Sequence, residues 1–573
     1  MSTMTTFFRS SVAAVAIFTA ATLQAQAGEE YYFNGIYNPT LADVNKIDLQ
    51  PQSFDTILPA KDISYNLLNV KGEVPAHVDS IEAARLNIQL AQEKLYKGFA
   101  KAGFGLYTTP LFELYYDQTR SKTNGYGLHY RHMSSNGGLK DRGPSDYSFN
   151  NIDGYYTAYL RQHTVQGRVG YDRRRVGYYG YPSTDSLENL MRSSPEPPDD
   201  ARKQVYNAIG FDVRVKSLYK DSTKLAHDVG LKVGNFTNLS RSRELNVVLD
   251  AKLSMRQGSE TYGGEVLVDN NAYRGVRDSL SDLRQNGTMV GLSPHVSTTD
   301  GTYLVRVGAG IFIDAMGKST FHFYPQAYAQ YRLFDDILVP YAGVDGRRMR
   351  NNLQSLAKEN PFIEGAPVLA NSSLMYELYG GLKGSLGSDV GFDVRISKSR
   401  TKNLPLFIGR ETLYDSVRYG DRFTAVYDRV DRLDIGGELR YSHNEHVNVH
   451  GGLHIFSYAT ETQAEAWNLP IYAISLGAVY DFQDKLLLKL DAQFLGRRKL
   501  PVSVPIGWND LSAAPTVTEA PGLLDLHLGL EYRYTKRFSL FLDCSNLSAA
   551  KYERWYNYPV QRTLLIGGAT YAF

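Results

Sequence analysis

The chain has 573 residues, and 62 Lys and Arg stand against 60 Asp and Glu, so the formal net charge is +2. A charge this close to balance argues neither for nor against a nucleic-acid or acidic partner. The single cysteine, Cys544, excludes an internal disulfide and any cysteine-based zinc pattern. Tyr (42) and Gly (50) exceed typical usage, a mixture expected where each strand shows one face to lipid and the other to water.

Residues 1–27 have the organisation of a secretory signal peptide. Arg9 supplies the charge of its first part, an apolar stretch runs from Val12 to Leu23, and Ala25-Gln26-Ala27 forms a small-x-small cleavage pattern. The apolar stretch is shorter than the roughly 20 residues of a membrane-spanning helix. We therefore expect cleavage between Ala27 and Gly28, with no lipid anchor because no cysteine follows the site.

Residues 28–96 form a segment that we expect to lie in the periplasm or to thread into the lumen of a barrel. Prolines at 39, 51, 59 and 75 break it into short extended pieces. Its last part fits two structures equally. Asp79-Ser80-Ile81-Glu82 could be a capping box that opens a helix, whereas the alternation of Leu86, Ile88 and Leu90 suits a strand.

From residue 97 onward, apolar and polar residues alternate in many separate stretches. In Gly522–Tyr534, the even positions from Leu524 to Tyr534 are apolar, and Asp525, His527 and Glu531 occupy the other face. The same alternation recurs at 209–216, 247–256, 303–313, 486–494 and 423–441, the last of these a strand of unusual length. One such strand would suit a soluble sandwich, but the repetition favours a transmembrane barrel.

The lengths of the connections give a second test. Long connections fall near 134–150, 181–202, 269–286, 347–371, 399–421, 459–469, 497–521 and 549–561, with short polar turns between them. Counting from both ends predicts about 22 strands, long extracellular loops and two periplasmic termini. The predicted fold class is therefore all-β, a single transmembrane antiparallel β-barrel over residues 97–573.

The final stretch, 562–573, ends the chain on an aromatic residue. Leu565, Gly567, Ala569, Tyr571 and Phe573 share one face. A terminal Phe after alternating apolar or small residues is typical of barrels delivered to the outer-membrane assembly machinery. Tyr571 and Phe573 are therefore the predicted assembly signal.

The stretches 423–441, 466–470 and 543–573 resemble the C-terminal barrel of TonB-dependent outer-membrane receptors. Within the last of them, 546–555 is similar to the family's penultimate strand and loop, and Tyr558-Pro559 and Arg562 continue the match. The resemblance implies a barrel of about 22 strands in the outer membrane of a Gram-negative envelope. Such receptors carry an N-terminal plug longer than residues 28–96, so we expect no full plug, which puts gating by TonB in doubt.

The sequence predicts no catalytic, cofactor or metal site. His450 and His454 share the lumen face, but four residues along a strand separate them by roughly 13 Å. The turn 443–446 could hold a metal loosely, although a solvated polar turn explains it better. The Gly-rich runs 308–310 and 567–568 lie inside strands and lack the helix that a phosphate loop requires. We expect no enzyme activity.

The predicted lumen lining mixes charges of both signs, for example Asp212 with Arg214 and Glu531 with Arg533, which indicates internal salt bridges. A lumen this wide needs a filling. The candidates are the loops 347–371, 399–421 and 497–521, or the segment 28–96.

Two functions fit these features. The resemblance favours a transport-related barrel, and the alternative is a non-transporting scaffold or accessory subunit of an outer-membrane complex for envelope assembly or uptake. The expected partners are outer-membrane lipids, the assembly machinery during biogenesis, and periplasmic or surface lipoproteins. We expect no nucleic-acid partner.

Overall fold

The computed structural model describes residues 95–118, 120–181, 201–276, 282–334, 336–414, 417–444, 446–501 and 517–573, without the side chains of 410–420. The predicted signal peptide, Ala27, Gly28 and nearly all of the segment 28–96 lie outside these residues. One compact unit contains Lys97–Phe573, and of a second, Leu41–Tyr96, only Leu95 and Tyr96 are described. No helix within the described ranges is long and apolar enough to cross a membrane.

Twenty-two strands form one antiparallel sheet. They are β1 (Gly98–Gly105), β2 (Thr109–Gln118), β3 (Asn124–Ser135), β4 (Tyr147–Tyr159), β5 (His163–Gly177), β6 (Lys203–Ser217), β7 (Ala226–Asn238), β8 (Arg243–Gln257), β9 (Glu260–Val276), β10 (Asp282–Thr299), β11 (Tyr303–Met316), β12 (Lys318–Tyr331), β13 (Val339–Met349), β14 (Ser372–Leu386), β15 (Val390–Tyr414), β16 (Val417–His443), β17 (Val447–Thr460), β18 (Tyr472–Phe482), β19 (Leu486–Leu495), β22 (Leu523–Arg533), β23 (Phe538–Ser545) and β26 (Leu564–Ala572).

In the described parts of the connections lie four short strands and one helix. The strands β20 (Arg498–Pro501) and β21 (Val517–Ala520) pair with each other, as do β24 (Glu553–Trp555) and β25 (Tyr558–Pro559). The helix α3 (Leu353–Glu359) lies between β13 and β14.

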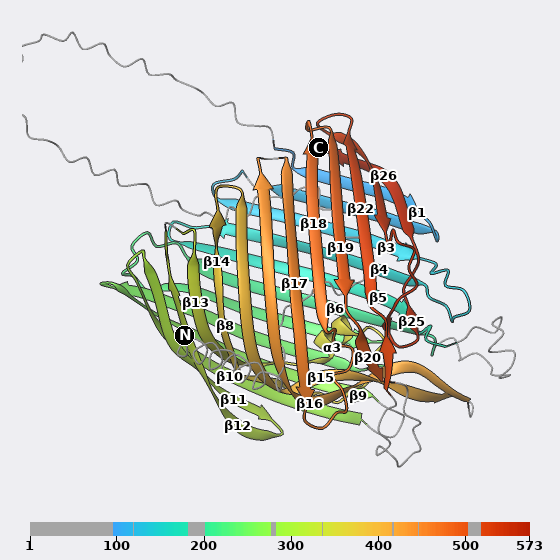
Figure 1. Cartoon of the computed structure of the whole chain (residues 1–573), viewed down its shortest axis with the longest axis horizontal. Helices are drawn as coiled ribbons and strands as arrows, with labels where there is room; N and C mark the ends of the chain where they lie inside the picture. Colours follow the sequence, from blue (N-terminus) through green and yellow to red (C-terminus); the bar gives the residue numbers. More distant parts are fainter. Residues whose placement is uncertain are drawn as a thin grey trace, which may run out of the picture. The chain divides into compact units, whose positions relative to one another are not determined.

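The large sheet closes on itself because its first and last strands pair (Figure 1). Each strand pairs with the next along the chain, and β26 pairs with β1 from Phe99↔Ala572 to Gly105↔Ile566. At the end of this seam, the Phe573 carbonyl accepts hydrogen bonds from the amides of Lys97 (2.9 Å) and Gly98 (2.8 Å). The predicted fold class and the predicted count of 22 strands are confirmed.

Side chains alternate between a polar interior and an apolar exterior. On β22, Leu524 and Leu528 are exposed on the outer face, whereas Asp525 and Glu531 are buried on the inner face. On β6, Ile209 is likewise exposed on the outer face. An outer belt of exposed apolar side chains around a polar lumen is the arrangement of a transmembrane barrel.

Ion pairs link adjacent strands, and strands two apart, along the lumen wall. Arg214 of β6 donates to Asp228 of β7 (2.6 Å) and to Asp250 of β8 (2.8 Å). Arg533 of β22 contacts Asp481 of β18 (2.7 Å). The opposite charge beside each of these groups offsets the cost of removing it from water. Arg214 and Arg533 therefore form internal salt bridges, as the mixed lining predicts, but their partners are Asp228, Asp250 and Asp481 rather than Asp212 and Glu531.

Among the described residues, the long connections lie at one end of the barrel. We call this end the loop rim, and its described connecting residues are 136–146, 178–181 with 201–202, 350–371, 461–471, 496–501 with 517–522, and 546–563. The opposite end, the turn rim, carries the start of β1, the end of β26 and short connections, the longest of which is 218–225.

Two of the predicted long connections are wrong. Near 269–286, β9 runs to Val276 and β10 starts at Asp282; near 399–421, β15 and β16 pair almost to their tips. These strands continue past the length that spans a bilayer, because backbone pairing does not require lipid. The prediction of an unusually long strand at 423–441 is confirmed by β16, which has 27 residues.

The seam depends on the close approach of two glycines. Gly103 of β1 lies opposite Gly568 of β26. A Cβ atom on Gly568 would lie 2.1 Å from the Ala102 carbonyl oxygen and 2.6 Å from the Gly103 Cα atom. Both are backbone atoms, so only a shift of the strand could make room.

We expect Gly568→Ala to weaken barrel closure by about 1–3 kcal/mol, the usual cost of overpacking. The measurement is the denaturant midpoint of unfolding. The readout is the heat-dependent change in electrophoretic mobility that distinguishes the folded barrel. Gly567→Ala is the matched control, because a Cβ atom there would come no closer than 3.6 Å to its nearest neighbour, a Leu542 side-chain atom. Equal midpoints for the two variants would contradict this account of the seam.

Candidate functional site

Three connections pack together at the loop rim. We call them the cap: 350–371 with α3, the distal part of the β15–β16 hairpin (404–409 and 421–428), and 546–563 with β24 and β25. Figure 1 shows α3 and β25 at the end of the barrel that carries the long loops. The cap shares one apolar core with the inward-facing ends of β5, β6, β7 and β9, formed by Val176, Tyr206, Phe236, Tyr273, Leu353, Leu356, Ala357, Ile363, Leu369, Phe407, Phe423, Ala425, Trp555 and Tyr558.

Side chains from the strand ends hold the backbone of 361–369. The hydroxyl of Tyr206 donates to the Pro361 carbonyl (3.0 Å), and that of Tyr273 donates to the Pro367 carbonyl (3.1 Å). Gln285 of β10 both donates to and accepts from the backbone of Leu369 at 2.9 Å. An irregular segment can lie buried only if its backbone polar groups are paired, and these side chains pair them.

The helix α3 is held at its first turn. Glu244 of β8 is 1% exposed, and its carboxylate accepts from the amides of Leu353 (2.7 Å) and Gln354 (3.3 Å). Asn352 and Ser355 complete a capping box. The negative charge also faces the positive end of the helix dipole, so Glu244 fixes where the helix lies against the barrel wall.

A cavity lies where the cap meets β4, β5 and β6. Its empty volume, including space open to solvent, is about 930 Å³. The lining is mostly aromatic or apolar and comprises Leu139, Ser145, Asp146, Tyr147, Phe149, Arg174, Val176, Gly177, Tyr179, Tyr206, Ala357, Lys358, Glu359, Pro361, Phe362, Arg554, Trp555, Tyr558, Val560 and Gln561.

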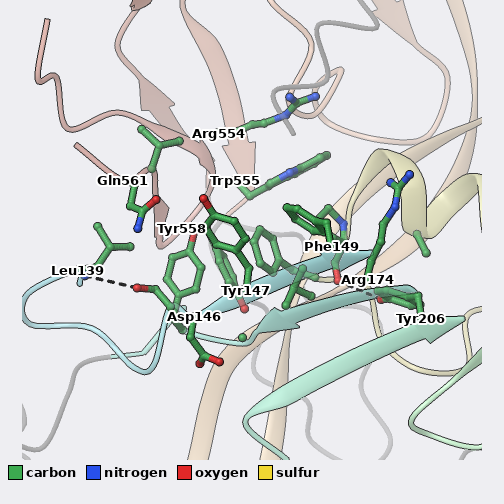
Figure 2. Close-up of a pocket in the computed structure, with 18 of the residues that line it drawn as sticks. Leu139, Asp146, Tyr147, Phe149, Arg174, Tyr206, Arg554, Trp555, Tyr558 and Gln561 are labelled. Atoms are coloured by element: carbon green, nitrogen blue, oxygen red, sulfur yellow. Dashed lines mark hydrogen bonds between the residues drawn. The ribbon is translucent and has the colours of Figure 1, made fainter. Parts of the chain in front are cut away.

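The aromatic side chains of this lining come from both walls. Figure 2 shows Tyr147, Phe149 and Tyr206 on the strand side and Trp555 and Tyr558 on the side of the 546–563 loop. Tyr147 stacks on Phe149, with centroids 5.1 Å apart. Aromatic faces on two sides suit a planar or apolar group, which they contact over a large area.

Tyr558 is the anchor of the loop wall. Its ring stacks on Phe362 with centroids 3.8 Å apart, and its hydroxyl donates to the Asp421 carbonyl. Burial raises the pKa of this phenol well above its ordinary value, so Tyr558 remains a neutral donor. One residue therefore joins all three parts of the cap.

The charged side chains of the lining are three basic ones, Arg174, Lys358 and Arg554, and two acidic ones, Asp146 and Glu359. Burial lowers the pKa of the Arg554 guanidinium, and Glu359 offsets part of this effect. Arg174 is bonded to Asp172 at 2.8 Å. The lining thus combines stacking surfaces with a small excess of positive charge.

No histidine or cysteine is among the described lining residues of this cavity. Concave, mostly apolar sites with a few placed polar groups are typical of small-molecule sites.

The residues predicted as sites lie elsewhere. Tyr571 and Phe573 are exposed near the turn rim, where they stack on each other, and nothing in their contacts tests a role in assembly. Ala27 and Gly28 lie outside the described residues. In the turn 443–446, His446 comes close to Asp481 and Asp484, with their ligand atoms within 4.8 Å of one another, so the predicted absence of a metal stays a prediction.

The sequence pattern alone does not predict the cavity. Trp555 and Tyr558 stand out in it only through the family resemblance, and no motif singles out Tyr147, Arg174 and Tyr206. A usable signal existed, because Tyr178-Tyr179-Gly180-Tyr181 and Trp555-Tyr556 are aromatic runs at the edges of predicted loops. Only the closed barrel shows that these runs meet.

The fold defines an outer-membrane-type β-barrel of 22 strands. No protein-family model matches the chain, and no curated protein matches it in sequence. Solved structures do match in fold, and those described below are all outer-membrane receptors or transporters.

The FrpB iron transporter from Neisseria meningitidis aligns with a TM-score of 0.63 and 9% identity, over 84% of this chain and 82% of that one. The pyoverdine outer membrane receptor FpvA from Pseudomonas aeruginosa aligns with a TM-score of 0.61 and 12% identity, over 84% of this chain and 79% of that one. The ferric-catecholate import receptor Fiu from E. coli aligns with a TM-score of 0.59 and 12% identity, over 84% of this chain and 82% of that one. The resemblance to the barrel of TonB-dependent receptors is confirmed at the level of fold.

We expect Tyr206→Phe and Tyr273→Phe to loosen the segment 361–369, because each removes one donor to a buried carbonyl, at about 1 kcal/mol each. Amide hydrogen exchange in 361–369 should rise several-fold while exchange in β6 and β9 stays unchanged. Tyr171→Phe is the control, since its hydroxyl bonds Asn207 in an exposed position. Unchanged exchange in both variants would show that the cap does not depend on these bonds.

Proposed function

We propose that this chain is an outer-membrane barrel that binds a small solute in the cavity under the cap as a step in uptake. The cavity carries the proposal, because it combines facing aromatic walls with three basic side chains at the loop rim of a receptor-type barrel. Fold alone does not define function, so the site must support it. In this proposal the loop rim faces outward, and the N- and C-termini of the chain face the periplasm.

The solute class follows from the lining. Aromatic faces favour a planar group, and Arg174, Lys358 and Arg554 favour a negative one. FpvA is described as bound to pyoverdine, and Fiu as a ferric-catecholate import receptor. A ferric catecholate complex, which is both aromatic and anionic, is therefore the first candidate to test.

We expect a synthetic ferric tris-catecholate complex to quench the fluorescence of Trp555 when it binds the purified, full-length barrel. Trp555→Phe should abolish the saturable quenching, whereas Trp467→Phe should retain it, because Trp467 is buried in a separate cluster with Leu406 and Val430. Absence of saturable quenching in the wild type, or its persistence in Trp555→Phe, would contradict binding at this site.

Arg174→Gln should weaken that binding about tenfold or more, since it removes a charge-assisted contact worth about 1.5–3 kcal/mol. Arg173→Gln is the matched control. It makes the same change one residue away on β5, in line with Tyr171 on the outer face, and should bind as the wild type does.

A second function, the scaffold or accessory subunit, draws support from the apolar core of the cap, because a packed cap suits a filled lumen. Partners would then dock on the long loops or on residues 28–96. Purification from native outer membrane in mild detergent separates the two. A barrel that arrives with fixed amounts of a lipoprotein or another barrel, and shows no quenching, is a scaffold.

For export, we propose the domain division of the sequence analysis: a signal peptide 1–27 removed between Ala27 and Gly28, a segment 28–96, and a barrel 97–573. We further propose that Tyr571 and Phe573 are read by the assembly machinery. Mature protein from the outer membrane should have Gly28 as its first residue by mass spectrometry. Phe573→Ala should lower its amount there, yet refold in detergent as the wild type does. A normal outer-membrane amount of this variant would argue against an assembly signal.

A further inference from the structure

The outer face of the barrel carries three arginines in one row at the loop rim. Arg243, at the start of β8, lies directly opposite Arg274 of β9, and Arg274 lies directly opposite Arg284 of β10. Directly opposite residues of antiparallel strands point to the same face, with their Cβ atoms about 5 Å apart. We call these three residues the arginine row.

The row faces outward. Glu244 and Tyr273, the sequence neighbours of Arg243 and Arg274, are each 1% exposed and point inward. Leu245, two residues after Arg243, is an exposed member of the apolar belt. The side chains of Arg274 and Arg284 are 55% and 70% exposed.

Like charges placed directly opposite on a sheet destabilise it unless an anion lies between them. One such anion is present. Asp282 contacts Arg274 at 2.5 Å and Arg284 at 3.9 Å. Three positive charges against one negative charge leave an excess of two, and Arg243 has no carboxylate partner in the described part of the chain.

Below the row, the outer face changes in a defined order. Asn270, Asn286 and Thr288 come first, and Asn270 donates to the Thr288 hydroxyl (2.7 Å). The exposed apolar residues of the belt, such as Val290 and Leu292, follow. Along β9 and β10 the outer surface is therefore apolar, then amide and hydroxyl, then guanidinium.

This order matches an amphiphile with acyl chains, a sugar backbone and phosphate groups. We infer that the arginine row binds the phosphates of the outer-leaflet glycolipid, lipid A, with its acyl chains on the apolar belt. Guanidinium groups bind phosphate bidentately, and Asn and Thr side chains pair with sugar hydroxyls. The inference rests on the proposed orientation, with the loop rim outward, and is independent of the cavity.

Native mass spectrometry of the full-length protein in detergent, with added bisphosphoryl lipid A, tests it. The wild type should retain lipid A at fixed stoichiometry, and the variant Arg243→Gln/Arg274→Gln/Arg284→Gln should bind it at least tenfold more weakly. Asp282→Asn should bind severalfold more tightly, because it removes the carboxylate that competes for Arg274.

The matched control is Arg161→Gln/Arg256→Gln/Arg332→Gln, which removes the same charge from exposed side chains at the turn rim and should leave lipid A binding unchanged. An equal loss of lipid A binding in both triple variants would show that only the overall positive charge matters, and it would overturn the site. So would unchanged binding in the arginine-row variant, or equal row-dependent binding to phosphatidylglycerol vesicles. Trp555 quenching should survive in the arginine-row variant, so a failure here is separable from a failure of the cavity.

Discussion

Backbone N–H and C=O groups inside a bilayer have no water to bond, and this constraint organises the whole molecule. A sheet meets it only by having no edge. The pairing of β26 with β1 therefore matters more than any single side-chain contact, because it converts 22 strands into a closed surface. The Gly103–Gly568 approach and the bonds of Phe573 to Lys97 and Gly98 are the local means of that closure.

Closure leaves a wide lumen, and two kinds of packing occur inside it. Along the wall, ion pairs such as Arg214 with Asp250 and Lys101 with Asp543 pair the charges that face inward. At the loop rim, by contrast, an apolar core joins the cap to the strand ends. The candidate cavity lies where these two environments meet, which is why stacking aromatics and charged groups are found in one lining.

The same alternation that places charges in the lumen places arginines on the outside where the strands outgrow the bilayer. β9 and β10, with 17 and 18 residues, are longer than the roughly ten residues that cross a membrane. Their added length carries Arg274 and Arg284 beyond the apolar belt. A long strand therefore builds surface at the level of lipid headgroups, and a long loop builds the cap.

The sequence by itself determined the class, the strand number and the facing of side chains such as Leu524 and Asp525, because a period of two residues is a local property. It did not separate a paired extension from a loop at 399–421, since polar residues beyond the bilayer suit either. The cavity, the cap and the arginine row were decided only by the tertiary structure. Each joins residues from strands or loops far apart in the chain, and the strand register that brings them together is a property of the closed sheet.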